Sequence, residues 1–85
     1  MEILIGKVTH YFPNIGVAVL QLSGELKVGD RVLIIGITTD LSQAVTSMEI
    51  EHRKVSSVGA GTEVALEVAE PVRKGDQVYR IVGES

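Results

Sequence analysis

The chain is 85 residues long, 45% hydrophobic and 22% charged, with a formal net charge of −3 at pH 7. This charge argues against non-specific nucleic-acid binding by the whole surface, which requires many Lys and Arg side chains, but it leaves room for a local basic patch. Cysteine is absent, so disulfides and thiolate metal sites are excluded. No run is apolar enough for a membrane helix and no secretory signal is visible, so we expect a cytoplasmic protein in which residues 1–85 form one domain.

Six strands are predicted, because β-branched residues recur throughout the chain and glycine interrupts them at intervals. In chain order they are Ile3 to Tyr11, Ile15 to Leu22, Arg31 to Ile37, Gln43 to Arg53, Glu63 to Ala69 and Gln77 to Val82. Phe12-Pro13-Asn14 predicts a tight hairpin turn between the first two strands, because proline presets φ and asparagine tolerates left-handed geometry. The residues from Thr39 to Ser42 are expected to form a loop.

Alternation of apolar and polar residues defines the faces of the predicted strands. In the fifth strand one face carries Val64, Leu66 and Val68, and the opposite face carries Glu63, Ala65 and Glu67. The run from Val32 to Ile35 is apolar on both faces, so one face fills the core and the other needs cover from a strand, a loop or a partner. Six short strands without a long helix favour a closed antiparallel β-barrel, with a small sandwich as the alternative.

One short phrase recurs in the sequence. Leu26-Lys27-Val28-Gly29-Asp30-Arg31-Val32 is echoed by Val72-Arg73-Lys74-Gly75-Asp76-Gln77-Val78 and, more weakly, by Val58-Gly59-Ala60-Gly61-Thr62-Glu63-Val64. Each copy has an apolar anchor, a turn with glycine at an expected positive φ, a polar residue and the start of a strand. The spacing between copies is irregular, so we interpret them as one turn used three times and not as solenoid repeats.

The order of these motifs resembles domain II of translation GTPases such as elongation factor Tu. The resemblance rests on the phrase from Leu26 to Gly36, the segment from Val45 to His52, the run from Ala60 to Leu66 and the closing phrase from Val72 to Val78. It implies the six-stranded antiparallel barrel of elongation and initiation factors. It also implies a role for Glu49 and His52, which match positions that help to hold the aminoacylated 3′ end of tRNA.

A rival resemblance is to the β-barrel module at the C-terminus of collagenase-like peptidases, which has similar Leu-x-Val-Gly-Asp turns. Two hypotheses follow. The first is a stand-alone translation-factor-like module that binds tRNA, the ribosome or a translation factor. The second is an accessory module that binds a protein partner, for example a peptidase-type catalytic unit. The acidic charge balance and the strand that is apolar on both faces motivate the second.

The sequence contains none of the familiar catalytic or cofactor-binding patterns. There is no P-loop, so we expect no nucleotide binding. Ser47 and His52, five residues apart on one predicted strand, should point to opposite faces, and no acid, base and oxyanion donor are assembled. His10 and His52, with Glu49 or Glu51, are the only candidate zinc ligands, and we favour two surface histidines over a metal site. We therefore expect no enzyme activity and no cofactor.

Two further groups are candidates for RNA or partner contact. Tyr11 and Phe12, beside His10, could stack on a base, although we favour a role in anchoring the hairpin. Arg53, following His52, is part of a short basic cluster, and the pair Arg73 and Lys74 forms a second one. A single basic face joining the two clusters would favour RNA, whereas dispersed charges would favour a protein partner.

Overall fold

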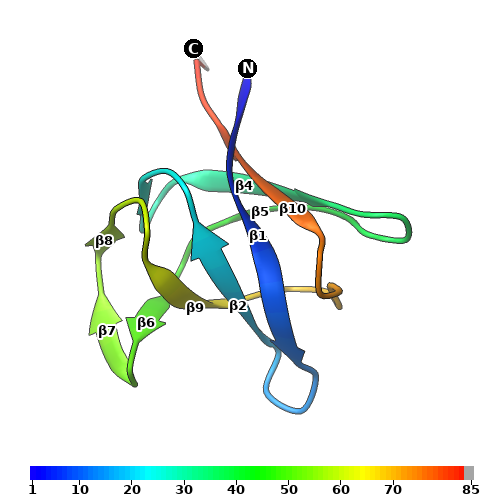
Figure 1. Ribbon diagram of the computed structural model, residues 1–85, viewed down its shortest axis with the longest axis horizontal. Coiled ribbons are helices and arrows are strands. Elements are labelled where there is room, and N and C mark those ends of the chain that lie inside the picture. Colours follow the sequence, from blue (N-terminus) through cyan, green and yellow to red (C-terminus); the bar gives the residue numbers. More distant parts are fainter. Residues whose placement is uncertain (84–85) are drawn as a thin grey trace.

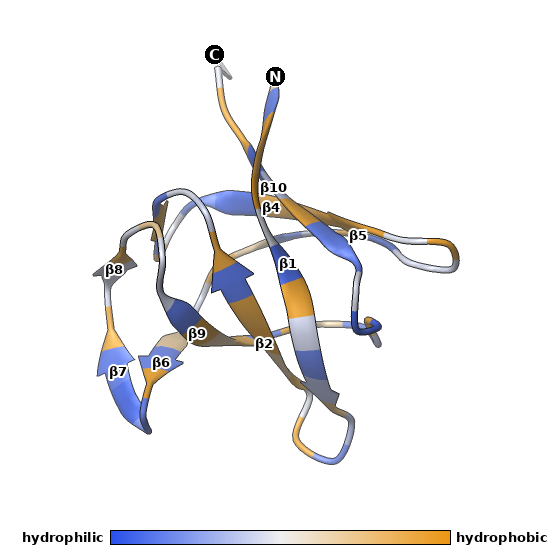
Figure 2. Ribbon diagram, in the orientation of Figure 1, coloured by the Kyte–Doolittle hydropathy of each residue, from blue (hydrophilic) through white to orange (hydrophobic). Residues whose placement is uncertain are grey.

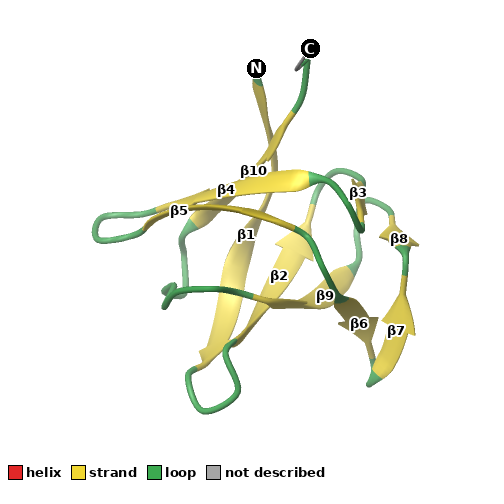
Figure 3. Cartoon of the chain, turned by 180° about the vertical axis from the view of Figure 1, so that it is seen from behind, coloured by secondary structure: helices red, strands yellow, loops and turns green. Residues whose placement is uncertain are grey.

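Strands and turns make up the whole of the described structure (Figure 3). The computed structural model describes residues 1–83, and these contain ten strands and no helix. The strands are β1 (Glu2–Phe12), β2 (Val17–Leu22), β3 (Leu26–Lys27), β4 (Arg31–Ile35), β5 (Asp40–Ala44), β6 (Met48–Ile50), β7 (Arg53–Val55), β8 (Ser57–Val58), β9 (Glu63–Glu67) and β10 (Gln77–Ile81). The predicted all-β class is therefore confirmed. None of the described residues belongs to a helix long and apolar enough to cross a membrane.

Eight of the strands form one antiparallel sheet, in the order β5-β4-β10-β1-β2-β9-β6-β7, and β3 pairs separately with β8. The long strand β1 pairs with β10 on one side and β2 on the other, with register shifts between Leu4 and Gly6 and between Val8 and His10. Such bulges bend a strand and increase its twist. The sheet curls in Figure 1, so that β4 and β5 face the strands β2 and β9 across an interior.

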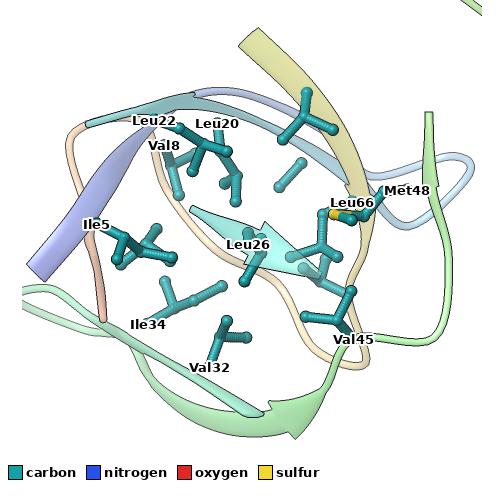
Figure 4. Packing of buried hydrophobic residues seen from close by; sticks show 14 of the residues in the cluster. Ile5, Val8, Leu20, Leu22, Leu26, Val32, Ile34, Val45, Met48 and Leu66 are labelled. Atoms are coloured by element: carbon teal, nitrogen blue, oxygen red, sulfur yellow. The ribbon is translucent and has the colours of Figure 1, made fainter. Parts of the chain in front are cut away.

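That interior is filled by aliphatic side chains from both halves of the curled sheet (Figure 4). The buried hydrophobic residues are Ile5, Val8, Ala18, Leu20, Leu22, Leu26, Val32, Ile34, Leu41, Val45, Met48, Val58, Val64, Leu66, Val68, Val72 and Val78. In β9 the predicted alternation is confirmed, because Val64 and Leu66 are buried while Glu63 and Glu67 are exposed. In β4, Val32 and Ile34 are buried and the outward Leu33 and Ile35 are half-buried.

The recurring phrase forms the same hydrogen-bonded turn three times. In the first copy Gly29, at φ 99°, donates its N–H to the carbonyl of Val45, and the N–H of Val45 donates to the carbonyl of Asp30. The corresponding pairs of bonds join Gly75 and Asp76 to Val8, and Gly61 and Thr62 to Leu22. All three glycines have positive φ, as predicted, because an L-residue with a side chain would be strained there.

A carboxylate completes two of the three turns. Asp30 Oδ2 accepts from the N–H of Lys27 at 3.0 Å, and Asp76 Oδ2 accepts from the N–H of Arg73 at 2.8 Å. Asp76 is buried, and its side chain lies against the backbone of Gly36, where an added Cβ would collide with it. The aspartates therefore satisfy backbone donors of their own turns, as Asx-type residues commonly do.

The predicted long strand from Gln43 to Arg53 is wrong, because the chain leaves the sheet twice within it. Val45 is buried and bonds to the Gly29–Asp30 turn, which ends β5 at Ala44. After β6, Glu51 and His52 take positive φ values of 50° and 67° and reverse the chain into β7. The expected loop from Thr39 to Ser42 is also wrong, because residues from Asp40 onward pair with β4 in strand β5.

The first hairpin is longer than predicted. Its turn covers residues 13–16, and the N–H groups of Ile15 and Gly16 both reach the carbonyl of Phe12, at 3.3 and 2.9 Å. The positive φ belongs to Gly16 and not to Asn14. Glycine at the end of this four-residue turn allows the chain to re-enter the sheet without steric strain. The predicted three-residue turn placed the left-handed residue at Asn14 and needed no glycine.

Candidate functional site

A hollow of about 660 Å³ lies over the outward face of β2, β9 and β6. Two projections border it: the β1–β2 hairpin, which carries Phe12 and Ile15, and the β6–β7 turn, which carries Glu51 and His52. Both projections lie at the same end of the molecule in Figures 1 and 3. The hollow therefore combines the surface of interior strands with two turns that rise beside it.

The floor of the hollow is apolar because two strands have hydrophobic residues on both faces. In β2 the inward residues Ala18 and Leu20 are buried in the core, so the alternation turns Val17 and Val19 outward into the hollow. Figure 2 shows β2 as hydrophobic over most of its length. Ala65 of β9 continues this floor beside them. An apolar outward face on an interior strand is a feature of binding surfaces.

The rim of the hollow is acidic. Glu49, Glu51, Glu63 and Glu67 line it, and no Lys or Arg of the described residues does. The Oγ1 hydroxyl of Thr9 lies 3.5 Å from Glu63 Oε2 and 3.2 Å from the carbonyl of Val19, to which it donates at the shorter distance. Lys54 is the cross-strand neighbour of Glu49 in β7, so one cation stands beside the four carboxylates. The remaining excess of acidic groups favours a ligand with cationic groups.

Ser47 and His52 both line the hollow, from the residue before β6 and from the β6–β7 turn. They do not share the continuous strand on which the expectation of opposite faces was based. That expectation assumed a continuous strand with a period of two, but the turn at Glu51 and His52 interrupts it. Both turn residues have left-handed φ values, which are strained for residues with a side chain. Strained backbone of this kind is concentrated at functional sites.

The aromatic residues of the first hairpin separate into two environments. The rings of His10 and Phe12 stack at a centroid distance of 6.1 Å, with Phe12 exposed at the edge of the hollow. Tyr11, between them in sequence, packs against the core from the other face of β1. Phe12 and His10 thus form the only stacked pair found among residues 1–83, and Tyr11 serves the interior.

The two basic clusters do not meet. Arg53 lies on the edge strand β7, whereas Arg73 and Lys74 lie in the turn that precedes β10. Four strands, β1, β2, β9 and β6, separate β10 from β7 in the sheet. Figure 1 shows β7 at one side of the molecule and the orange turn before β10 at the other. Of the predicted site residues, the hollow brings together Glu49, His52 and Phe12, and leaves out Arg53, Arg73, Lys74 and Tyr11.

No group of three or more His, Cys, Asp or Glu side chains in the described part of the chain is arranged to hold a metal ion. Sequence reasoning missed the floor residues Val17, Val19 and Ala65 and the second hairpin residue, Ile15. A signal for the floor is present in the sequence, because the run from Val17 to Leu20 is apolar on both faces, as is the run from Val32 to Ile35 in β4.

Curated proteins similar to the chain are proteases. The chain is 39% identical over 79 residues to an uncharacterized protease of Methanocaldococcus jannaschii, a match that covers 92% of the chain and 19% of that protein. It is 37% identical over 81 residues to a collagenase of Porphyromonas gingivalis, covering 93% of the chain and 20% of that protein. The chain thus spans about a fifth of the length of these relatives. No known protein-family profile matches the sequence.

Two solved structures with the same fold come from a Geobacillus thermoleovorans protein whose description reads "putative U32 peptidase". A crystal structure of its C-terminal domain superposes with a TM-score of 0.87 at 20% identity, covering 93% of the chain and 92% of that domain. The selenomethionine variant of the domain gives a TM-score of 0.84, also at 20% identity. At this identity the likeness concerns the fold alone.

The resemblance to domain II of translation GTPases is therefore wrong as an identification, and so is the function of a translation-factor-like, RNA-binding module. The relatives that the chain matches over nine-tenths of its length are named as proteases and collagenases. The rival resemblance, to the C-terminal module of collagenase-like peptidases, agrees with these matches and with the fold of the Geobacillus domain. Over nearly all of its length, the chain is similar to one part of proteins of the peptidase and collagenase kind.

Proposed function

We propose that the chain is a non-catalytic protein-interaction module that works beside a peptidase unit, and that the hollow is where it contacts a polypeptide. The observation that carries the proposal is the match to 92% of the chain within a protease of which it spans only 19%. A match that covers nearly all of the chain but a fifth of the relative is typical of an accessory domain within a larger protein. The apolar floor supports polypeptide contact, because exposed apolar patches with a polar rim mark interaction sites.

The absence of catalysis is also part of the proposal. Peptide hydrolysis needs donors or cations that stabilise the oxyanion of the tetrahedral intermediate. Of residues 1–83, those that line the hollow supply two hydroxyls, from Ser47 and Thr62, the imidazole of His52 and four glutamates, and none of them is Lys or Arg. Carboxylates in these positions would repel a developing oxyanion. The composition of the hollow thus supports binding and not hydrolysis.

The finer fold is a proposal of its own: a closed antiparallel barrel of the six strands β1, β2, β9, β5, β4 and β10. Its support is the side chain of Gln43 in β5. Gln43 Nε2 donates to the carbonyl of Glu67 at 2.8 Å, and Gln43 Oε1 accepts from the N–H of Ala69 at 2.7 Å. A side-chain amide that bonds both ways in this manner replaces a peptide group and would link β5 to the end of β9, closing the ring.

Three expectations from the sequence stay predictions alongside this proposal. They are a single domain over residues 1–85, a cytoplasmic location, and a partner that is a protein. The dispersed positions of Arg53 and of Arg73 with Lys74 support a protein partner over a nucleic acid, because phosphate binding needs basic groups on one face.

Binding and hydrolysis of one probe test the proposal together. Two relatives are named as collagenases, so fluorescein-labelled gelatin, a denatured collagen, is a suitable polypeptide. The purified chain is expected to bind it saturably in an anisotropy titration and to release no labelled fragments over hours of incubation. Release of fragments that persists after repurification would contradict the absence of catalysis. A lack of gelatin binding, or tighter binding to tRNA than to gelatin, would contradict the proposed function.

A further inference from the structure

The charges around the hollow are unlike those of the rest of the chain. The whole chain carries 11 acidic and 8 basic residues, whereas the hollow is lined by four glutamates and no Lys or Arg of the described part. The carboxylates of Glu63 and Glu67 are on exposed residues of β9, and that of Glu49 is on the neighbouring strand β6. A ligand that enters between them is therefore favoured when it carries positive charge beside the groups that touch the floor.

The apolar floor and the hairpin beside it favour a ligand that has a large apolar group. Val17, Val19 and Ala65 are half-buried, and Phe12 and Ile15 are exposed by 46% and 68% of their surface. Covering these side chains removes apolar surface from water, and about 25 cal/mol is gained for each Å² that is buried. A large apolar side chain that lies on Val17 and Val19 and against Phe12 would cover most of them.

Recognition at this place cannot use strand addition. β2 is paired with β1 and β9, β9 with β2 and β6, and β6 with β9 and β7. The strands beneath the hollow thus have no free edge at which the backbone of an extended peptide could pair. The hollow therefore recognises the ligand through its side chains, so the amino-acid sequence of the ligand determines the affinity.

We infer that the hollow binds a polypeptide segment in which one large apolar side chain is flanked by Lys or Arg. This inference rests on the proposed function and names the class of polypeptide that the module takes. The apolar side chain lies on the floor, and the flanking cations lie beside Glu63 and Glu67, which stand on either side of Ala65 along β9, with Glu49 next to Ala65 on β6. Contacts of this kind are exposed to solvent, so binding is expected to weaken as salt is added.

Three fluorescein-labelled heptapeptides test the inference: one with a central Phe between two Lys, one with Phe between two Glu, and one with Ser between two Lys, each completed by Gly and Ser. The first should bind about tenfold more tightly than either of the others, since it alone supplies both the charge and the apolar group. Equal affinities for the three peptides, or preference for the Glu-flanked one, would overturn the inference.

A charge-reversed variant and a matched control locate the site. Glu63→Lys with Glu67→Lys changes two glutamates of the rim, and Glu2→Lys with Glu25→Lys makes the same change in net charge at exposed positions outside the hollow. The rim variant should bind the Lys-flanked Phe peptide about tenfold more weakly and the control within about twofold of the original chain. An equal loss of peptide affinity in both variants would show that the net charge of the chain, and not the rim of the hollow, controls binding, and it would overturn the inference.

Gelatin separates failure of the inference from failure of the proposed function. If the chain binds gelatin but does not distinguish the three peptides, the inference fails and the proposed function stands. If it binds neither gelatin nor any peptide, both fail. Circular dichroism of each variant must retain the spectrum of the original chain, and a rim variant that unfolds is replaced by the single change Glu67→Gln, for which a smaller loss of affinity, about threefold, is expected.

Discussion

Replacing the tip of the β6–β7 turn by Asn-Gly, through Glu51→Asn and His52→Gly, is expected to stabilise the protein. Glu51 and His52 have φ values of 50° and 67°, and they are the only positive-φ residues other than glycine among residues 1–83. The left-handed conformation costs about 1–2 kcal/mol for a residue with a Cβ. Asn-Gly is the pair that a two-residue turn of this kind favours.

The size of the gain follows from two opposing terms. Relief of strain at both positions favours the variant by about 2 kcal/mol, and the greater freedom of glycine in the unfolded chain subtracts about 0.4–1 kcal/mol. A net gain of about 1 kcal/mol should raise the thermal midpoint by about 4–8 °C in a protein of this size. If the side chains of Glu51 and His52 contact the ligand, the same variant should bind the Lys-flanked Phe peptide more weakly.

Thermal and urea unfolding followed by circular dichroism measure this effect. Gly29→Ala provides a control of opposite sign, because Gly29 has φ 99° and open space where a Cβ would stand, so the substitution adds backbone strain without a collision. It should lower stability by about 1–2 kcal/mol. A tip variant that is no more stable than the original chain would refute the reasoning from strain.

Three further changes test the fold and the hollow. Gln43→Ala removes both bonds that link β5 to the end of β9, and it should cost about 1–2 kcal/mol in urea unfolding; an unchanged midpoint would argue against closure of the barrel by this side chain. Gly36→Ala should cost about 1–3 kcal/mol, because the added methyl group collides with the buried carboxylate of Asp76, and wild-type stability would show that the turn adjusts freely. Phe12→Ala should leave stability nearly unchanged and weaken the Lys-flanked Phe peptide about fivefold, as anisotropy would measure; equal affinity would exclude Phe12 from the contact.

Local features of the fold were predictable from the sequence because short stretches determine them. The three turns around Gly29, Gly61 and Gly75 were identified from their phrase, since each needs glycine at positive φ. The alternation in β9 likewise reports which face is buried. The division of the predicted strand from Gln43 to Arg53 was not predictable, because it depends on Val45 bonding to a turn fifteen residues earlier in the chain.

The mistaken resemblance has a physical explanation in the same turns. The motifs that suggested a translation factor are largely the phrases from Leu26 to Val32 and from Val72 to Val78, and the structure shows what they do: each satisfies the hydrogen bonds of one turn and starts a strand. Such phrases report the turns of an antiparallel all-β fold and carry little information about ligands. The hollow brings together residues from Phe12 to Glu67, so no short motif describes it.

The central claim is that the β2–β9–β6 face binds a polypeptide through an apolar floor with an acidic rim. A titration of the ¹⁵N-labelled chain with the Lys-flanked Phe peptide, followed by amide chemical shifts, tests it most directly. The account predicts that the largest shifts cluster at Val17, Val19, Glu49 and Ala65, with Arg73, Lys74 and the rest of the turn before β10 unaffected. Shifts centred on the basic residues, or spread evenly over the chain, would contradict it.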